Sequence, residues 1–460
     1  MRTAVLLALL SACVDRTIAE LPPQTQGQAT KYIPVSTDID ILFVIDDSPS
    51  TADKQKVFEK NFTNFVAALD AFPGGRPNMH IGVISTSVDL GSGDWGTGCA
   101  HPSPFDGRLQ NAAKITGCTP PSGKWIEDVA LPDGTRQTNY TGALDSTLAC
   151  IADLGSSGCG FEAPLQAIEH ALDGSHPENA GFLRPGAYLA VIVLTDEDDC
   201  SVKDKTLFTL DSTKYRSDDF RCQPMFAYQC DQPISATDAK TYTGCHQRTD
   251  SYLETTQHYY DVLSKLKAQG QVVVAVLGGP ASTTIKTGAI TMPPAPFHQD
   301  LALLPSCDAT INGNYAFGRP AIRLNDFVTS FGDHGLFRTI CQGDYSQTLR
   351  DIGDLLFESV SPCLAGDVAA DDIDPTTPGL QLDCTVTDVV NLNTSEQHET
   401  IIPRCPMKDA STPDTATRPC WWVKSDPAAC AAPSSGIELH VERAGAPPVG
   451  DNVKVSCAIK

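Results

Sequence analysis

Three short runs of mostly apolar residues, at 39–45, 188–194 and 272–277, constrain the fold of this chain most strongly. Each is too short for a typical core helix and lacks the strict alternation of a strand with one solvated face. Such runs are typical of strands buried on both faces, and residues 80–85 form a further candidate. Segments with helical spacing of apolar residues, such as 57–69, lie between them. We therefore predict an α/β fold with a doubly wound, mostly parallel sheet in three layers.

Three long insertions interrupt this pattern, at about 88–142, 201–247 and 279–315. The first is rich in Gly, Pro, Asp and Thr, and the third is rich in Pro and Thr, which are residues that favour loops. Cys99 and Cys118 both lie in the first insertion, which we expect to be stapled by a disulfide.

The composition changes after residue 362. Five cysteines are dispersed over short strand-like runs beyond residue 381, after a stretch rich in Asp, Thr and Pro. We predict that 37–362 form the α/β unit and that 363–460 form a small, β-rich, disulfide-stapled C-terminal region.

The first residues resemble a bacterial lipoprotein leader. Arg2 precedes a short apolar stretch, and residues 10–13 read Leu-Ser-Ala-Cys, which resembles a lipobox. We predict that 1–12 are a signal peptide and that Cys13 is acylated. An ordinary signal peptide with an incidental cysteine is the alternative. Residues 13–36 would then be a lipidated N-terminus and flexible tether.

Seventeen cysteines favour an oxidising compartment. Setting Cys13 aside leaves sixteen, enough for eight disulfides. No later apolar stretch approaches the roughly 20 residues that span a bilayer. We therefore expect a protein of the cell envelope, at the outer membrane, in the periplasm or facing the surface, whose membrane contact is its lipid.

The formal charge of −23 excludes one large class of function. Nucleic-acid affinity comes mostly from Lys and Arg, so we expect no nucleic-acid partner. The same charge argues against binding anionic lipid by electrostatics.

The sequence Asp46-Asp47-Ser48-Pro49-Ser50 has the form D-x-S-x-S and follows the first predicted strand directly. Ligands of open α/β sheets bind beyond the carboxyl ends of the strands. A hard cation such as Mg²⁺ prefers octahedral oxygen ligands and keeps several waters. A carboxylate from Asp46 and hydroxyls from Ser48 and Ser50 could therefore hold such an ion with a position left open.

This motif and its placement resemble the metal-ion-dependent adhesion site of von Willebrand factor type A domains, over about 37–362. The resemblance implies that Ser48 and Ser50 coordinate the ion directly and that a third loop adds a Thr or an acidic residue. Here Glu162 stands at that place, as a Glu does in integrin β-subunit domains. Asp196, in Thr195-Asp196-Glu197, matches the Asp of the family's T-D-G motif, with Glu197 in place of Gly.

The implied cation is Mg²⁺ first, with Mn²⁺ or Ca²⁺ as alternatives, since the carboxylate of Glu162 adds charge. The implied partner is a protein that presents an Asp or Glu to the open position. The resemblance gives no role to three further acidic residues of this loop, Glu197, Asp198 and Asp199. They could form a second cation site, although a solvated acidic loop is the simpler interpretation.

Several alternatives remain open. Ser50 could cap the following helix, and Asp46 the strand end, with no metal bound. A haloacid-dehalogenase-like phosphatase also places an Asp after its first strand, but its D-x-D motif has Ser48 here instead of the second Asp. The ten histidines are scattered, and lone histidines are more often structural than catalytic.

We expect a binding or adhesion protein and not an enzyme. The main alternative is a structural or assembly lipoprotein in which the metal only stabilises the fold.

Overall fold

The computed structural model describes most of the chain. The described residues are 28–34, 38–72, 75–92, 98–131, 133–210, 222–267, 270–290, 300–365, 368, 376–390, 396–427, 430, 434–445 and 452–459. Cys13 and the predicted signal peptide lie outside them.

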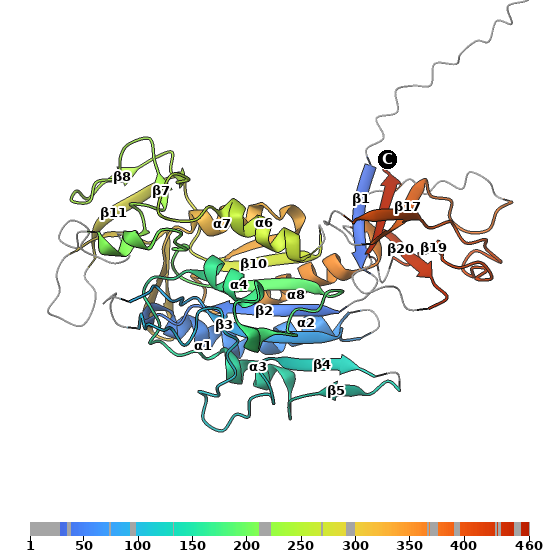
Figure 1. Ribbon diagram of the computed structural model, residues 1–460, viewed down its shortest axis with the longest axis horizontal. Coiled ribbons are helices and arrows are strands. Elements are labelled where there is room, and N and C mark those ends of the chain that lie inside the picture. The colour runs from blue at the N-terminus through green and yellow to red at the C-terminus, as the bar shows by residue number, and fades with distance from the viewer. Residues whose placement is uncertain are drawn as a thin grey trace, which may run out of the picture.

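A seven-stranded mixed sheet forms the centre of the molecule (Figure 1). Five neighbouring strands are parallel. The sixth strand runs antiparallel to them, and the seventh, at the edge, runs antiparallel to the sixth. In spatial order they are β15 (Gly335–Thr339), β10 (Val272–Gly278), β6 (Tyr188–Leu194), β2 (Ile39–Ile45), β3 (Met79–Ser85), β4 (Ile126–Ala130) and β5 (Arg136–Thr138). The prediction of an α/β fold around a central sheet is confirmed at this level.

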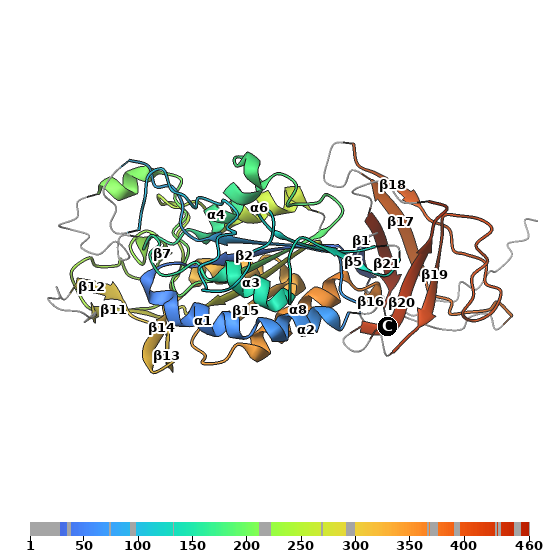
Figure 2. The ribbon, with the colours of Figure 1, turned by 90° about the horizontal axis from the view of Figure 1, so that it is seen from below.

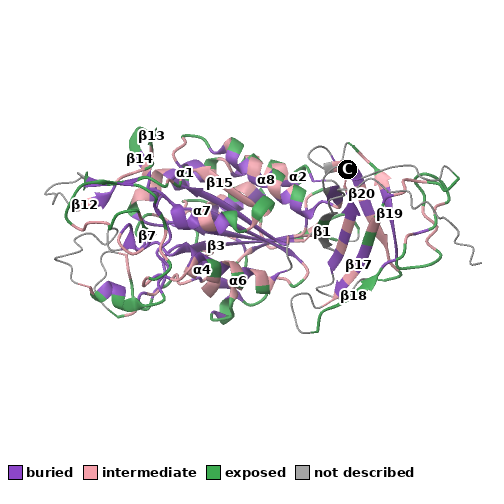
Figure 3. Cartoon of the chain, turned by 90° about the horizontal axis from the view of Figure 1, so that it is seen from above, coloured by how far each residue is buried: buried purple, intermediate pink, exposed green. Residues whose placement is uncertain are grey.

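Two separate hydrophobic clusters line the two faces of the sheet. Leu42 and Val44 of β2 belong to one cluster, and Ile41 and Phe43 to the other, as the alternation of side chains along a strand requires. The first cluster includes α4 (Pro164–Leu172), α6 (Thr256–Leu266) and α7 (Ile322–Thr329); the second includes α1 (Ala52–Lys60), α2 (Phe62–Asp70), α3 (Leu144–Ala152) and α8 (Ser346–Val360). Figure 3 shows buried strands between helices that expose their outer faces.

The strand order changes direction at β2. The next strand in the chain, β3, lies on one side of β2, and β6 lies on the other. Ile45 and Leu194 are paired at the carboxyl ends of β2 and β6. The loops after these two strands therefore start side by side and then diverge, which is the geometry that opens a ligand crevice in such sheets.

Eight disulfides pair all sixteen cysteines after Cys13, which confirms the predicted number. The first insertion is stapled by two disulfides, and neither joins Cys99 to Cys118. Cys99 pairs with Cys159 and Cys118 pairs with Cys150, so both bonds tie the insertion to the segment that contains α3 and the following loop. The remaining pairs are Cys200–Cys222, Cys230–Cys245, Cys307–Cys341, Cys363–Cys430, Cys384–Cys457 and Cys405–Cys420.

Small antiparallel sheets and single turns build the loops beyond the strand ends. The strands are β7 (Tyr228–Gln229), β8 (Thr241–Tyr242), β9 (His246–Gln247), β11 (Ile285–Ile290), β12 (Asp300–Leu303), β13 (Cys307–Ile311) and β14 (Asn314–Gly318). The 3₁₀ turns are η1 (Pro49–Thr51), η2 (Pro177–Asn179), η3 (Lys205–Thr209) and η4 (Gly332–His334).

The C-terminal region consists of two small sheets at the opposite end of the molecule (Figure 2). One contains β16 (Cys363–Ala365), β20 (Ser434–Glu442) and β19 (Cys420–Ser425); the other contains β1 (Gln28–Pro34), β21 (Asn452–Ala458), β17 (Cys384–Val390) and β18 (His398–Ile401).

Strand β1 corrects the predicted tether. Residues 28–34 pair antiparallel with β21 along their whole length. Their backbone groups therefore form hydrogen bonds with this last strand instead of with water. The Nζ of Lys31 also donates to the carbonyls of Ser361 and Cys363, at 2.7 and 3.0 Å. A flexible tether remains a prediction only for the residues before 28.

Candidate functional site

The candidate site begins where β2 ends. Asp46 is fully buried, and its N–H donates to the carbonyl of Leu194 at 2.9 Å, which joins the ends of β2 and β6. One carboxylate oxygen of Asp46 accepts a hydrogen bond from the N–H of Ser48 at 2.8 Å, and the other accepts one from the Thr195 hydroxyl at 2.9 Å. The bond to Ser48 spans two residues, as in an Asx turn, and directs the chain from the strand into η1.

Two serines extend this hydrogen-bond chain to the neighbouring loop. The hydroxyls of Ser48 and Ser50 lie 3.1 Å apart, and the Ser50 hydroxyl donates to Oδ1 of Asp196 at 3.0 Å. Pro49 is exposed and Ser50 is half-buried, so this turn is the part of the site that reaches solvent. The structure thus brings together four of the five predicted ligands, Asp46, Ser48, Ser50 and Asp196.

A buried lysine, which the sequence analysis did not single out, belongs to the same cluster. Lys54 of α1 is fully buried, forms an ion pair with Oδ2 of Asp196 and donates to the Ser50 carbonyl at 3.1 Å. Its Nζ lies 5.0 Å from the ring centroid of Phe317 in β14. The sequence gives one sign that Lys54 is buried: it lies three residues before Val57, on the apolar face of the predicted helix.

Asp47 anchors two further loops beside the site. Its Oδ1 accepts hydrogen bonds from the hydroxyls of Ser85, the last residue of β3, and Ser87, at 2.7 and 2.9 Å. Its carbonyl accepts the N–H of Gly158 at 2.6 Å. Burial raises the pKa of Asp47, and the two serine hydroxyls oppose that rise. Asp47 therefore positions the rim of the site.

Glu162, the fifth predicted ligand, is buried on the loop before α4. Its carbonyl accepts the N–H of Cys200 at 2.8 Å, and the next N–H, of Ala163, donates to the carbonyl of Thr86 at 2.9 Å. The N–H of Thr86 in turn donates to Ile45. The loop that carries Glu162 thus borders the ends of β2 and β3.

The two carboxylates of the cluster have different surroundings. Burial, reinforced by the nearby charge of Asp196, raises the pKa of Asp46 to about 7, although the donors of Ser48 and Thr195 oppose the shift. Those two donors are neutral, whereas Asp196 forms an ion pair with Lys54. Asp46 is therefore the carboxylate whose negative charge is least offset by the contacts described for it.

The donor set fits a hard divalent cation. Two carboxylates and two hydroxyls lie in one continuous hydrogen-bond chain, and oxygen donors of these kinds suit Mg²⁺ or Ca²⁺. Lys54 binds Oδ2 of Asp196, while Oδ1 faces Ser50. The raised pKa of Asp46 marks a charge that a cation would stabilise.

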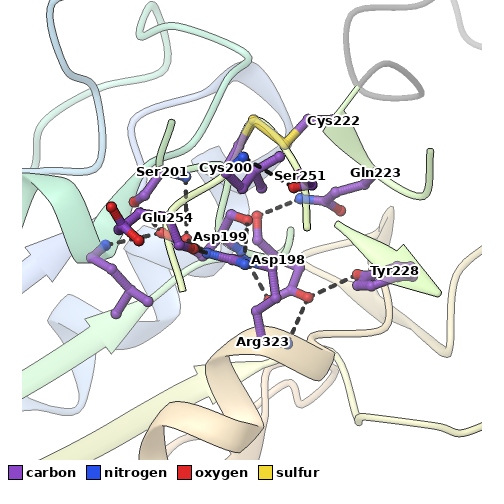
Figure 4. Close-up of a disulfide and its surroundings, with 12 residues drawn as sticks. Asp198, Asp199, Cys200, Ser201, Cys222, Gln223, Tyr228, Ser251, Glu254 and Arg323 are labelled. Carbon is purple, nitrogen blue, oxygen red and sulfur yellow. Dashed lines mark hydrogen bonds and ion pairs between the residues drawn. A yellow bond between two sulfur atoms is a disulfide. The ribbon is translucent and has the colours of Figure 1, made fainter. Parts of the chain in front are cut away.

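The three remaining acidic residues of this loop have other roles. Asp198 is fully buried and accepts the N–H groups of Arg323 and Leu324, at 2.8 and 3.0 Å, where α7 begins. It also accepts the Tyr228 hydroxyl at 2.8 Å. Burial raises the pKa of Asp198 to about 6, against the opposing effect of Arg323. Figure 4 shows this network beside the disulfide between Cys200 and Cys222.

Asp199 is also fully buried and pairs with the guanidinium of Arg323 at 2.8 Å. Its other oxygen accepts the N–H of Leu165 in the first turn of α4 at 3.1 Å. Glu197 pairs with Arg319 at 3.1 Å. The prediction of a solvated acidic loop is wrong, and protein donors occupy the carboxylates that we considered for a second cation site. Their partners come from β7, from α4 and from the segment around the start of α7, which local sequence does not reveal.

Comparisons with known proteins add limited information. No family model and no characterised protein sequence matches the chain. The similar solved structures include a von Willebrand factor type A protein from Catenulispora acidiphila, with 10% identity and a TM-score of 0.29, covering 95% of this chain and 65% of that one. A second is the pilus adhesin SpaC of Lactobacillus rhamnosus GG, with 9% identity and a TM-score of 0.29, covering 94% of this chain and 41% of that one. A third is the human COPII-coat protein Sec24c, with 10% identity and a TM-score of 0.33, covering 97% of this chain and 48% of that one.

The chain spans about two thirds or less of the length of these structures. At such scores and identities the likeness assigns no function. The fold and the site define a mixed α/β protein with a buried carboxylate and hydroxyl cluster at the carboxyl edge of its sheet.

Asp46→Asn is expected to change how stability depends on pH in the presence of a chelator. The folded pKa of about 7 lies above the usual value near 3.9, so the folded chain retains a proton that the unfolded chain has released. The free energy of unfolding of the wild type should therefore fall, relative to Asp46→Asn, as pH rises from about 4 to 7. The largest effect is about 4 kcal/mol, at about 1.4 kcal/mol per pKa unit. Urea unfolding at several pH values measures it, and parallel profiles for the two proteins would contradict the assignment.

Arg323→Met is expected to destabilise the fold by about 3–5 kcal/mol, because it leaves the buried Asp199 carboxylate without its cation. Arg338→Met is the matched control, since Arg338 pairs with Asp351 at the surface and should cost at most about 1 kcal/mol. Urea denaturation of both variants tests the difference. Equal losses would show that the Arg323 pair has no special role.

Proposed function

We propose that this chain is an extracytoplasmic binding protein of the von Willebrand factor A type. In this proposal the sheet is doubly wound, and the crevice at the ends of β2 and β6 engages a protein partner through a divalent cation. The observation that carries the proposal is the hydrogen-bond chain from Asp46 through Ser48 and Ser50 to Asp196.

Each residue of the cluster has a distinct role in the proposed cation site. Asp46 and Asp196 would supply negative charge, and Ser48 and Ser50 would supply neutral oxygen ligands from the turn nearest solvent. A bound cation would offer a coordination position to a carboxylate of the partner. Because the chain carries a net charge of −23, that cation would also offset the repulsion between the partner's Asp or Glu and this surface.

Mg²⁺ is the first choice of cation, with Mn²⁺ and Ca²⁺ as alternatives. Carboxylate and hydroxyl oxygens are hard donors, which Mg²⁺ prefers in near-octahedral geometry. Glu162, on the bordering loop, is proposed as a further ligand. Its charge would favour tighter cation binding than a Thr at the same place.

An exposed aromatic residue supports partner binding on this side of the molecule. Tyr315 is 67% exposed, on the β14 strand whose Phe317 lies against Lys54. Tyr at a protein interface combines a large apolar area with a polar hydroxyl. The rim of the proposed interface therefore includes the hairpin of β13 and β14.

The cluster supports binding better than catalysis. Ser48 stands where a phosphatase of the haloacid-dehalogenase type would need its second carboxylate, so that chemistry lacks its general acid. The buried pair of Lys54 and Asp196 favours a second candidate, in which the cluster only stabilises the fold. The binding role and the structural role differ in one prediction: only the binding role lets an added carboxylate coordinate the bound cation.

The proposed location is the cell envelope, with a lipid on Cys13 as the anchor. Eight disulfides are typical of proteins outside the cytoplasm. None of the described helices has both the length and the apolar character that a bilayer crossing requires.

Labelled palmitate should be incorporated into the wild-type chain and not into Cys13→Ser when both are expressed in a bacterium with lipoprotein processing, because acylation needs the thiol. Cys13→Ser should then fractionate away from membranes. Equal labelling of both proteins, or membrane association of both, would contradict the anchor.

Mg²⁺ is expected to stabilise the chain against thermal unfolding, since a ligand that binds only the folded state adds RT ln(1 + [L]/Kd). The gain is about 2.7 kcal/mol at a hundredfold excess over Kd. It should vanish in Ser48→Ala and Asp46→Asn and persist in Ser122→Ala, a serine outside the cluster. Differential scanning calorimetry with Mg²⁺, Mn²⁺ or Ca²⁺ measures the shift.

The controls separate the candidates. Acetate, the simplest carboxylate probe, should add stabilisation only when the cation is present, with sodium chloride as the ionic-strength control. A cation shift without an acetate effect would favour the structural role. No shift with any of the three cations would overturn the metal site.

A further inference from the structure

A second cluster of metal-ligating side chains lies away from the strand-end site. Nδ1 of His170 is 3.0 Å from Oδ1 of Asp106, and Nε2 of His176 is 3.4 Å from Oδ2 of the same carboxylate. One ligand atom from each of these residues can be chosen so that all three lie within 4.8 Å of one another. The residues come from the first insertion, from α4 and from the turn before η2.

One ring nitrogen of His176 lies inside this cluster without a hydrogen-bond partner. Its side chain is only 8% exposed, and Nε2 has no hydrogen-bond partner although it faces Asp106. A buried polar atom without a partner costs free energy unless something else satisfies it. His170 is half-buried and lies on the side of the cluster that reaches solvent, which leaves a route for a ligand.

The backbone holds the three residues in place. Asp106 has φ of 47° and Gly107 has φ of 80°, both in the left-handed region. A Cβ at Gly107 would lie 2.6 Å from the backbone nitrogen of Ala171, so only glycine allows this turn to approach α4 so closely. Asn179 of η2 donates to the carbonyls of Gly107 and Ala171, at 2.9 and 3.1 Å. It thereby joins all three segments, as outer-shell residues do around metal sites.

We propose that Asp106, His170 and His176 bind a transition-metal ion of the Zn²⁺ class. Two imidazoles and one carboxylate are ligands that zinc commonly takes. Ligand atoms about 2.0–2.1 Å from a tetrahedral ion lie about 3.3 Å apart, and one ligand atom from each of the three residues here lies within 4.8 Å of the other two. Three protein ligands leave a fourth position for water or an external donor.

This site differs in chemistry from the strand-end cluster. The donors at the ends of β2 and β6 are all oxygens, which suit Mg²⁺ or Ca²⁺. Two of the three donors here are imidazole nitrogens, which suit Zn²⁺. The proposal is therefore independent of the function proposed above. Its competitor is an ion-pair cluster in which the two histidines only hold Asp106.

Isothermal titration calorimetry with Zn²⁺ alone tests the proposal on the full chain, in a Cys13→Ser background that removes the unpaired thiol. We expect one equivalent to bind. His176→Ala and His170→Asn should each weaken binding by at least about tenfold. Two variants are tested because His176 is buried and its replacement could disturb folding, which circular dichroism would reveal, whereas His170 is half-buried.

His258→Asn is the matched control, since His258 of α6 pairs at 3.0 Å with Glu169 of α4, the helix that carries His170, but lies outside the cluster. It should leave Zn²⁺ binding unchanged, as should Asp46→Asn. Equal Zn²⁺ binding by the wild type and folded His170→Asn would overturn the site and leave an ion-pair cluster only. Loss of binding in Asp46→Asn with retention in His170→Asn would place the ion at the strand-end site and would equally overturn the proposal.

Discussion

The burial of carboxylates at the ends of the two central strands is the constraint on which the rest of the structure depends. Asp46, Asp47, Asp196, Asp198 and Asp199 are all at most 1% exposed. An ionised carboxylate taken from water costs several kcal/mol unless it gains hydrogen bonds or a cation. The loops beyond these strand ends supply those partners, and the disulfides join several of the loops to neighbouring segments.

The buried carboxylates differ in whether their partners are cations or neutral donors, and this difference points to the candidate site. Asp199 receives a guanidinium and Asp196 an ammonium, whereas the donors to Asp46, from Ser48 and Thr195, are all neutral. Burial, together with the nearby charge of Asp196, raises the pKa of Asp46, and its neutral donors only oppose that rise. Of the two carboxylates in the strand-end cluster, the one without a cationic partner, Asp46, lies beside the serine turn that reaches solvent. His176 shows a similar contrast, because its buried Nε2 has no hydrogen-bond partner.

Much of the fold followed from local pattern. The apolar runs predicted β2, β6 and β10 closely, because strands buried on both faces must be apolar throughout. The D-x-S-x-S motif placed Asp46, Ser48 and Ser50 together because they share one turn. Strand β1 could not be predicted in the same way, since its partner lies more than 400 residues later in the chain. Pairing over such a separation depends on the register of another strand, which short-range pattern does not encode.

By itself, therefore, the sequence determined the alternation of strands and helices, the number of cysteines available for pairing and the serine turn after the first strand. These features depend on residues close together in the chain. Only the tertiary structure decided which carboxylates are neutralised, because Lys54, Arg319 and Arg323 reach them from α1 and from the segment around the start of α7. It also brought Asp106 to two histidines more than 60 residues away. Electrostatic partners are set by distance in space, and that distance exists only once the helices have packed on the sheet.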